Sequence, residues 1–216
     1  MLNKKIIIIL FVVAVFFILL IVYNYTFTDP FVKSSVESGE EIYEQNCMQC
    51  HGENGRGRKM NTATTLNNQE FLTLASDELL KGVISEGRKG TKMPSFHVDY
   101  GGNLTGEQIG DVVLYMRSWH KQNVEMETPD KITGDPNLGR KLYKNNCLSC
   151  HGKGVGPSVV NKAFLEQVSD EFLWDTIAYG RSDTAMGPSL KGTGGIRELT
   201  KKEISAIVRY LRNMED

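Results

Sequence analysis

The stretch Cys47-Met48-Gln49-Cys50-His51 returns one hundred residues later as Cys147-Leu148-Ser149-Cys150-His151. We call these two stretches the first and second frames. Together they hold all four cysteines and two of the four histidines of the 216-residue chain. Because no cysteine lies outside them, any bond or reaction of a cysteine thiol in this protein takes place in one of these two frames.

The order Cys-x-x-Cys-His is typical of the covalent attachment of c-type haem. Two thiols three positions apart, at the end of a short helix, reach the two vinyl groups of one porphyrin. The adjacent histidine then points its imidazole at the iron from the same face. A redox dithiol would lie near a βαβ pattern, which is absent, and a zinc ribbon would pair two Cys-x-x-Cys frames about 15–20 residues apart. Structural disulfides would not need the histidines.

The frames therefore predict two covalently attached haem c groups as cofactors. The predicted attachment thiols are those of Cys47, Cys50, Cys147 and Cys150. The predicted iron-binding imidazoles are those of His51 and His151. A large apolar macrocycle also fills the centre of a domain that is small for a self-sufficient core.

The sequence around the frames is an internal repeat. Residues Gly39–Cys47 match Gly139–Cys147 at an offset of 100, and later landmarks match at offsets of 93 and 95. The order of the landmarks is unchanged, so the length changes fall in loops and the chain contains a duplicated domain. We expect domains at residues 37–120 and 135–216, joined by a linker at residues 121–134.

Each copy is predicted to be helical, and no alternating strand pattern stands out. Apolar residues recur at helical spacing near the end of each copy, and helix-starting residues precede the expected helices. These starting residues are Ser38 with Glu41, Ser76, Thr105 with Gln108, Asp135 with Pro136, Ser169, and Thr200 with Glu203. The sequence therefore predicts an all-α fold.

Two methionines are candidates for the second axial ligand of each iron. Met93 and Met186 take the same place in the repeat, each in a Gly-Arg-x-x-x-x-Met loop between the frame and the last helix. Methionine is ordinarily core filler, but both loops contain Gly and Pro, where core methionine is less expected. His97 has no counterpart in the second copy and is the alternative ligand of the first iron. Methionine would raise the reduction potential relative to His/His ligation.

Other residues near the predicted sites have more than one interpretation. Arg88 and Arg181 precede the methionine loops and either pair with haem propionates or lie solvated. The carbonyl of Pro157 is expected to accept the imidazole N–H of His151 and so to fix its tautomer. The first copy has no proline at the corresponding place. His120 is expected to be a solvated residue at a helix end.

An apolar run at the N-terminus predicts a membrane anchor. Residues Ile6–Val22 are 17 consecutive apolar residues, and such a run spans roughly 26 Å as a helix. A cleaved signal peptide would have a shorter apolar core and a small-residue cleavage site, which the following residues do not offer. Lys4 and Lys5 place the N-terminus in the cytoplasm. Residues 1–28 are expected to hold a single-pass anchor in the cytoplasmic membrane, with both haem domains on the extracytoplasmic side.

Charge and composition exclude one class of partner. The chain has 25 basic and 26 acidic residues and a formal net charge of −1, so nothing argues for nucleic-acid binding through a basic face. Its 40% apolar and 24% charged residues are ordinary globular usage. The expected partners are redox proteins in or at the membrane, and the lipid bilayer itself through Ile6–Val22.

The two frames, the Met93-Pro94 and Met186-Gly187-Pro188 loops and the terminal helices resemble the class I cytochrome c family in a tandem dihaem form. The resemblance covers about residues 37–120 and 135–215. It implies two tandem helical domains that follow the transmembrane helix and hold one covalent haem each. The axial ligands that it implies are His51 and His151 on the proximal side, and Met93 and Met186 on the distal side.

Most members of that family shuttle single electrons, so the resemblance implies electron transfer between respiratory-chain partners on the extracytoplasmic face. A fixed dihaem subunit of a terminal oxidase or of a quinol-oxidising complex is one alternative. A dihaem redox enzyme, such as a thiosulfate-oxidising cytochrome or a peroxidase, is another. Methionine at both distal positions argues against a permanently open iron site, so no catalytic residue is assigned and electron transfer without catalysis is favoured.

Overall fold

The computed structural model describes residues 6, 10–18, 30–58, 63–152, 156–192 and 197–214. Within these residues the protein is helical and contains no β-strand, as the sequence predicts. Pairing of the β type is confined there to two isolated bridges, between His97 and Leu104 and between Leu190 and Leu199.

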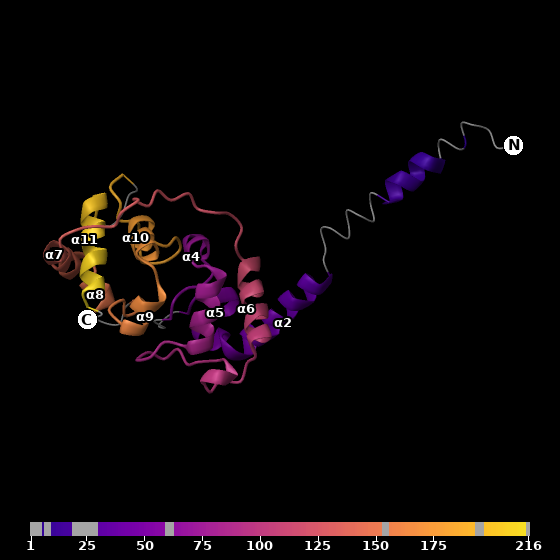
Figure 1. Ribbon diagram of the computed structural model, residues 1–216, viewed down its shortest axis with the longest axis horizontal. Coiled ribbons are helices and arrows are strands. Elements are labelled where there is room, and N and C mark those ends of the chain that lie inside the picture. The colour runs from indigo at the N-terminus through magenta and orange to yellow at the C-terminus, as the bar shows by residue number, and fades with distance from the viewer. Residues whose placement is uncertain are drawn as a thin grey trace.

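The helices fall into two sets, one for each copy of the repeat (Figure 1). The first set is α2 (Pro30–Asn46), α3 (Met48–His51), the 3-10 turn η1 (Glu53–Gly55), α4 (Gln69–Leu74), α5 (Asp77–Glu86), the 3-10 turn η2 (Val98–Tyr100) and α6 (Gly106–Ser118). The second set is α7 (Pro136–Asn146), α8 (Leu148–His151), α9 (Lys162–Gln167), α10 (Asp170–Tyr179) and α11 (Lys201–Arg212). We call these sets, with their loops, the first and second domains.

In each domain the first and last helices pack against each other, α2 on α6 and α7 on α11. Glycine permits this close approach. A Cβ atom on Gly39 would lie 2.0 Å from the carbonyl oxygen of Asp111, and one on Gly139 would lie 1.9 Å from that of Ala206. Since α3 and α8 follow α2 and α7 directly, the two crossings fix the positions of the two frames. The fully buried side chains around the crossings include Tyr43, Leu72, Ile109, Val112 and Val113, and Leu165, Trp174, Ile204, Ile207 and Val208.

Most of the predicted helix starts are confirmed. The capping boxes of α6 and α11 are formed, and serine side chains cap α5 and α10. Asp135 caps α7, with Pro136 in its first turn. The prediction that Ser38 and Glu41 start the first helix is wrong. That helix begins at Pro30, so Ser38 lies in its interior, where its hydroxyl donates to Asp111 Oδ2 at 2.9 Å and links α2 to α6.

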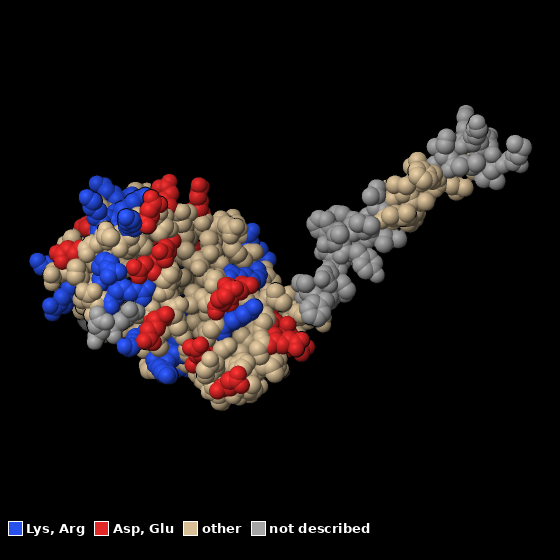
Figure 2. Space-filling view, viewed as in Figure 1, with Lys and Arg blue, Asp and Glu red and all other residues tan. Residues whose placement is uncertain are grey.

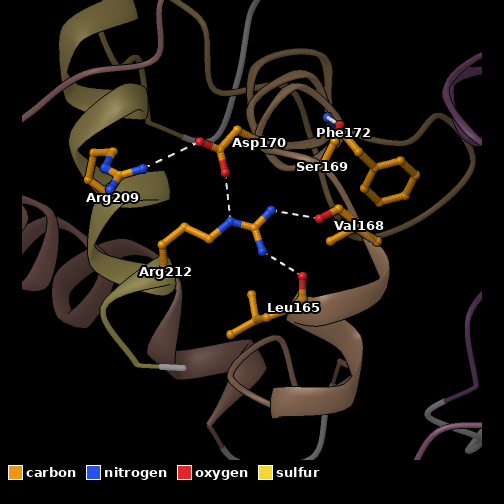
Figure 3. Close-up of polar contacts among 7 residues, drawn as sticks. All are labelled: Leu165, Val168, Ser169, Asp170, Phe172, Arg209 and Arg212. Carbon is orange, nitrogen blue, oxygen red and sulfur yellow. Dashed lines mark hydrogen bonds and ion pairs between the residues drawn. The ribbon is translucent and has the colours of Figure 1, made fainter. Parts of the chain in front are cut away.

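An arginine on the last helix holds the corner between the two middle helices of the second domain (Figure 3). Arg212 Nε donates to Asp170 Oδ1 at 2.6 Å. The other two guanidinium nitrogens donate to the carbonyl oxygens of Leu165 at 2.5 Å and Val168 at 2.6 Å. One side chain thus satisfies carbonyls at the end of α9 and an acid at the start of α10.

The first domain repeats this corner at equivalent positions. Arg117 donates to Asp77 Oδ1 at 2.7 Å and to Leu72 O at 2.6 Å, and its third nitrogen binds Ala75 O. The duplication seen in the sequence is therefore also a duplication of side-chain contacts.

The two domains pack through their middle helices, α4 beside α10 and α5 beside α9. The rings of Phe71 and Phe172 meet edge to face at this contact, with centroids 6.3 Å apart. Figure 2 shows basic and acidic side chains intermixed over the visible face of both domains.

Residues 10–18 form a helix that stands apart from both domains (Figure 1). Its side chains are all exposed, that of Phe11 to 69%. The part of the chain that the structure describes holds no helix with the length and apolarity needed to cross a bilayer. Of the predicted anchor Ile6–Val22, residues 7–9 and 19–22 lie outside the described residues, as do Lys4 and Lys5.

Candidate functional site

Each frame lies on one short helix that directly follows a long one. Cys47 stands at the N-terminal end of α3 and Cys147 at that of α8, so the thiols and the imidazole follow one another around a single turn. No disulfide joins the four cysteines. The first cysteine of each frame is half-buried and the second is exposed. Each domain therefore presents two neighbouring thiols and an imidazole from one turn of chain.

The first thiol of each frame is a weaker acid than an ordinary cysteine thiol. Burial, with the neighbouring second thiol of the frame adding to it, raises the pKa of Cys47 to about 12 and that of Cys147 to about 11. The reactive thiol of a redox dithiol has a lowered pKa instead. Among the described residues, no group of three or more His, Cys, Asp or Glu side chains is placed to hold a metal ion. The raised pKa values of Cys47 and Cys147 are therefore unlike those of a reactive dithiol.

A backbone carbonyl holds the imidazole of His51. Its Nδ1 lies 2.9 Å from the carbonyl oxygen of Thr64, and Nδ1 carries the proton because a carbonyl only accepts. Burial lowers the pKa of His51, the bond to Thr64 opposes this, and the nearby cation of Arg88 lowers it further. The result is a neutral imidazole whose Nε2 keeps its lone pair, which is the form that binds a metal.

The second frame has the same arrangement with a different acceptor. His151 Nδ1 lies 2.8 Å from the carbonyl oxygen of Pro157, so the contact predicted for Pro157 is confirmed. In the first domain Thr64 takes this place after a longer stretch of chain that includes η1. The sequence carries no signal for Thr64, because any residue type can supply a carbonyl.

The methionine loops have the same hydrogen bonds in both domains. Arg88 N donates to Met93 O at 3.0 Å, Met93 N donates to Thr91 Oγ1 at 3.1 Å, and that hydroxyl donates to Arg88 O at 2.8 Å. The second loop repeats the three bonds at 2.7, 3.1 and 2.8 Å, with Met186 and Thr184 in the equivalent positions. Both methionines are half-buried. The threonine that precedes each methionine by two residues is a sequence signal that would have identified the loops as equivalent structures.

The two remaining histidines lie near the last helix of the first domain. His97 caps η2 by accepting from Asp99 N at 3.1 Å through Nδ1, and a Cβ on Gly106 of α6 would lie 3.6 Å from its Nε2. The prediction of a solvated His120 is wrong. It is half-buried and its Nε2 lies 3.3 Å from Thr73 Oγ1, because the chain turns back onto α4 after α6 ends.

Arg88 and Arg181 are half-buried and stack on aromatic rings of the opposite domain, so neither is a solvated loop residue. The guanidinium carbon of Arg88 lies 4.9 Å from the ring centroid of Phe164, and that of Arg181 lies 4.8 Å from that of Phe71. Burial lowers the pKa of each arginine to about 10, and at Arg181 the charge of Arg88 adds to this while Glu70 opposes it. Two neighbouring desolvated cations favour an anionic group beside them.

The residues of both frames fit a covalently attached haem. In each domain a pair of thiols would form the thioether bonds, and an imidazole whose Nδ1 is bonded to a backbone carbonyl would bind the iron. The two arginines supply cations suited to propionates, and Arg88 lies close enough to His51 to lower its pKa. Half-buried apolar side chains beside the core offer surface that an apolar macrocycle covers, among them Leu66, Leu79 and Phe96 in the first domain and Val159, Val160 and Leu190 in the second.

The sequence model of one protein family matches the chain twice. The family is described as cytochrome c oxidase, cbb3-type, subunit III, and the matches cover residues 34–116 and 134–211. The chain belongs to this family. Each match contains one complete frame and one methionine loop. The two cytochrome c domains accordingly carry two covalently attached haem c groups.

Relatives in this family are similar over most of the chain. The cbb3-type cytochrome c oxidase subunit FixP of Bradyrhizobium diazoefficiens is 28% identical over 190 residues, which are 82% of this chain and 60% of the relative. The subunit CcoP of Azospirillum sp. (strain B510) is 29% identical over 210 residues, which are 83% of this chain and 62% of the relative. The chain thus spans about three fifths of the length of these curated relatives. Among solved structures, a chain of the Kuenenia stuttgartiensis reducing HAO-like protein complex has a TM-score of 0.45 at 21% identity, over 83% of this chain and 96% of that chain.

Proposed function

We propose that this protein is a membrane-anchored dihaem subunit of a cbb3-type terminal oxidase, and that it passes single electrons from an extracytoplasmic donor toward the other oxidase subunits. One observation carries the proposal: a single oxidase-subunit family matches both domains, each with a complete frame. The sequence by itself favours a mobile carrier and keeps the fixed subunit as an alternative. The names of the relatives FixP and CcoP move the preference to the fixed subunit.

The proposed division of the chain follows the repeat. Residues 1–28 hold the anchor, residues 37–120 and 135–216 form the two haem domains, and residues 121–134 join them. Supporting this division, the contacts of Arg117 recur at Arg212.

His51 and His151 are the proposed proximal ligands, and Met93 and Met186 the proposed distal ones. A backbone carbonyl holds the proton on Nδ1 of each histidine and leaves Nε2 for the iron. Equivalent hydrogen bonds shape both methionine loops, whereas Nδ1 of His97 already accepts a bond from Asp99 N, which favours Met93. When bound, the haem supplies a one-electron iron couple, whose potential methionine raises relative to histidine.

The proposed anchor is Ile6–Val22. In support, residues 10–18 are helical, exposed and uncharged, and an exposed apolar helix suits a lipid environment. Lys4 and Lys5 then place the N-terminus in the cytoplasm and both domains outside it.

Gentle detergent extraction tests the oxidase assignment. The full chain, tagged at its C-terminus, is purified from its native membrane, and the proteins that accompany it are identified by mass spectrometry. We expect the other oxidase subunits in stoichiometric amounts, together with oxygen consumption by the purified sample. If the chain purifies alone while oxygen reduction stays with a separate fraction, the mobile-carrier interpretation replaces this one.

Protease treatment tests the topology separately. A protease added to the extracytoplasmic face of spheroplasts should release a soluble fragment that contains both haems, by cutting between residues 24 and 38. A mature chain that starts after Tyr23 would show that the apolar run is removed, and the anchor assignment would be wrong.

A further inference from the structure

The second domain holds the methionine loop of the first. Gln167, the last residue of α9, binds two consecutive loop residues. Its Nε2 donates to Gly87 O at 3.0 Å, and its Oε1 accepts from Arg88 Nε at 3.1 Å. Asn161, the N-cap of α9, donates from Nδ2 to Lys89 O at 2.9 Å. Three consecutive residues of this loop therefore have hydrogen-bond partners in the other domain.

The first domain holds the methionine loop of the second in return. Asn68, the N-cap of α4, donates from Nδ2 to Ser182 O at 2.8 Å. Glu70 Oε2 accepts from Ser182 N at 3.1 Å and from Ser182 Oγ at 2.9 Å. Asn68 is equivalent to Asn161 in the repeat, and Ser182 is equivalent to Lys89. The two asparagines thus make the same contact in opposite directions.

These contacts are adjacent to the bonds that reach the methionines. Gln167 binds the side chain of Arg88, whose own N–H donates to Met93 O at 3.0 Å. Ser182 directly follows Arg181, whose N–H donates to Met186 O at 2.7 Å. A displacement of the opposite domain therefore moves the residue that fixes the backbone of each methionine.

We propose that each domain positions the distal methionine of the other, with Asn161 and Gln167 acting on Met93 and with Asn68 acting on Met186. The three are positioning residues, because they touch the loops and not the haem. The proposal rests on the assignment of the two methionines as distal ligands under the proposed function. It makes each iron site depend on contacts from the opposite domain, those of α9 at the first methionine loop and those of α4 at the second.

Stacking between the domains supports the same positioning. Arg88 lies over the ring of Phe164 and Arg181 over that of Phe71, so each arginine of a methionine loop also packs on the helix that carries the holding asparagine. Backbone bonds inside a loop do not by themselves fix its position on the domain. Contacts from a helix of the neighbouring domain do so, because they bind three consecutive residues of the first loop and Ser182 of the second.

Asn161→Asp is the sharpest test at the first iron. Aspartate is an N-cap as good as asparagine, so the bond from Phe164 N to the side-chain oxygen is kept. The variant removes only the Nδ2 donor and places a carboxylate oxygen against Lys89 O. Gln167→Glu is an independent second variant, since it keeps the acceptor for Arg88 Nε and loses the donor to Gly87 O.

Asn68→Asp is the matched variant for the second iron, and it keeps the cap bond to Phe71 N. Ser169→Asp is the control. It adds the same charge at another helix N-cap of the second domain, where the side chain accepts from Phe172 N of its own helix.

The measurement is a spectroscopic redox titration of the full-length holoprotein. Met93→Ala and Met186→Ala first assign the two reduction steps to their domains. We expect Asn161→Asp and Gln167→Glu to lower the potential of the step that Met93→Ala moves, without moving the other step. Asn68→Asp should lower the potential of the step that Met186→Ala moves and leave the other step unchanged. Both falls are expected because methionine ligation favours the reduced iron, so a displaced methionine favours it less. Ser169→Asp should move neither step.

Two results distinguish the possible failures. If Met93→Ala and Met186→Ala move their steps but Asn161→Asp, Gln167→Glu and Asn68→Asp leave both steps unchanged, the reciprocal positioning is wrong and the ligand assignment stands. If Met93→Ala and Met186→Ala themselves leave both steps unchanged, the ligand assignment fails and the proposal falls with it.

Discussion

The hydroxyl oxygen of Thr128 lies 2.8 and 2.7 Å from the two carboxylate oxygens of Asp175. Thr128 belongs to the segment between the domains, and Asp175 is a buried residue of α10, only 3% exposed. Burial raises the pKa of Asp175, the bond from Thr128 opposes this, and Glu171 adds to the rise. The segment between the domains is therefore tied to the second domain through a carboxylate whose charge is costly to bury.

Asp175→Asn should raise the free energy of unfolding at neutral pH. The folded pKa of this acid lies above its unfolded value, so the folded state holds the proton more tightly and the ionised form destabilises the fold. The asparagine oxygen still accepts from Thr128, and its amide group can donate to the same hydroxyl. The gain should shrink as the pH falls through the folded pKa of Asp175, and denaturant unfolding at several pH values measures it. A loss of stability at neutral pH would contradict this account. The comparison variant Thr128→Val should cost about 1–3 kcal/mol, since it leaves the carboxylate unpaired.

Arg212→Leu should destabilise the second domain by about 2–4 kcal/mol, because it removes the donors to Asp170 Oδ1 and to two carbonyl groups. Arg209→Ala is the control on the same helix. Its contact with Asp170 is 3.4 Å long and its side chain is 39% exposed, so the cost should stay below about 1 kcal/mol. Urea unfolding of the holoprotein measures both, and equal costs would show that the corner in Figure 3 does not depend on Arg212.

The intact protein should carry two haem additions in its mass and keep its colour on a denaturing gel. Cys147→Ala removes a thiol from the second frame only, so attachment should weaken or fail there while the first frame stays loaded. Intact-mass measurement of the variant checks this. One addition or none in the unaltered protein would refute the assignment of two attachment frames.

Met93→Ala should lower the potential of one haem and remove its Met–iron absorption, whereas His97→Ala should leave the spectrum unchanged. The physical reason is the place of His97, whose Nδ1 accepts from Asp99 N and whose ring lies beside the start of α6. Spectra of the full-length variants decide between the two. Loss of ligation in His97→Ala, with Met93→Ala silent, would assign a His/His haem to the first domain.

Gly87→Ala should destabilise the first methionine loop by about 1–3 kcal/mol. Gly87 has a φ of +69°, and a Cβ there would lie 2.5 Å from the backbone carbon of Pro94, the residue after Met93. Gly82→Ala, five residues earlier on α5, is the matched control. A Cβ at that position meets no atom within 4 Å, so alanine should stabilise the helix by about 0.5–1 kcal/mol. Thermal unfolding separates the two, and a neutral Gly87→Ala would contradict the close approach.

Capping residues predicted the start of a helix well where the capping side chain bonds to its own helix. Thr105 and Thr200 cap their helices as their spacing from Gln108 and Glu203 indicates. Ser38 shows the limit of such signals. Its spacing to Glu41 is that of a capping box, but α2 starts earlier and the hydroxyl bonds to Asp111 across the helix crossing. Tertiary packing offered that side chain a partner that no local rule contains.

The sequence predicts those parts of the candidate site that depend on a particular residue type. Both frames follow from residue types, and the Pro157 contact was predicted from the proline that closely follows the second frame. The first copy has no such proline, and Thr64 contributes a carbonyl that any residue type can supply. The contacts of Asn68 and Asn161 with the opposite domain were not predictable either. Each asparagine caps a helix, α4 or α9, and this role alone accounts for the residue type.

Asn68 pairs with Ser182, and Asn161 pairs with Lys89. These two pairs have a consequence for the origin of the contact between the domains. Equivalent residues that exchange the same contact in both directions make an isologous interface, the kind that relates two identical subunits by a two-fold axis. Two separate copies of such a domain, each with asparagine at this place, would present the same donor and acceptor to one another. Joining the two copies in one chain replaces association between molecules by an effective concentration set by the connecting segment. It also frees each half to diverge, as Glu70 and Gln167 already have, since their equivalents in the repeat are Ala163 and Leu74.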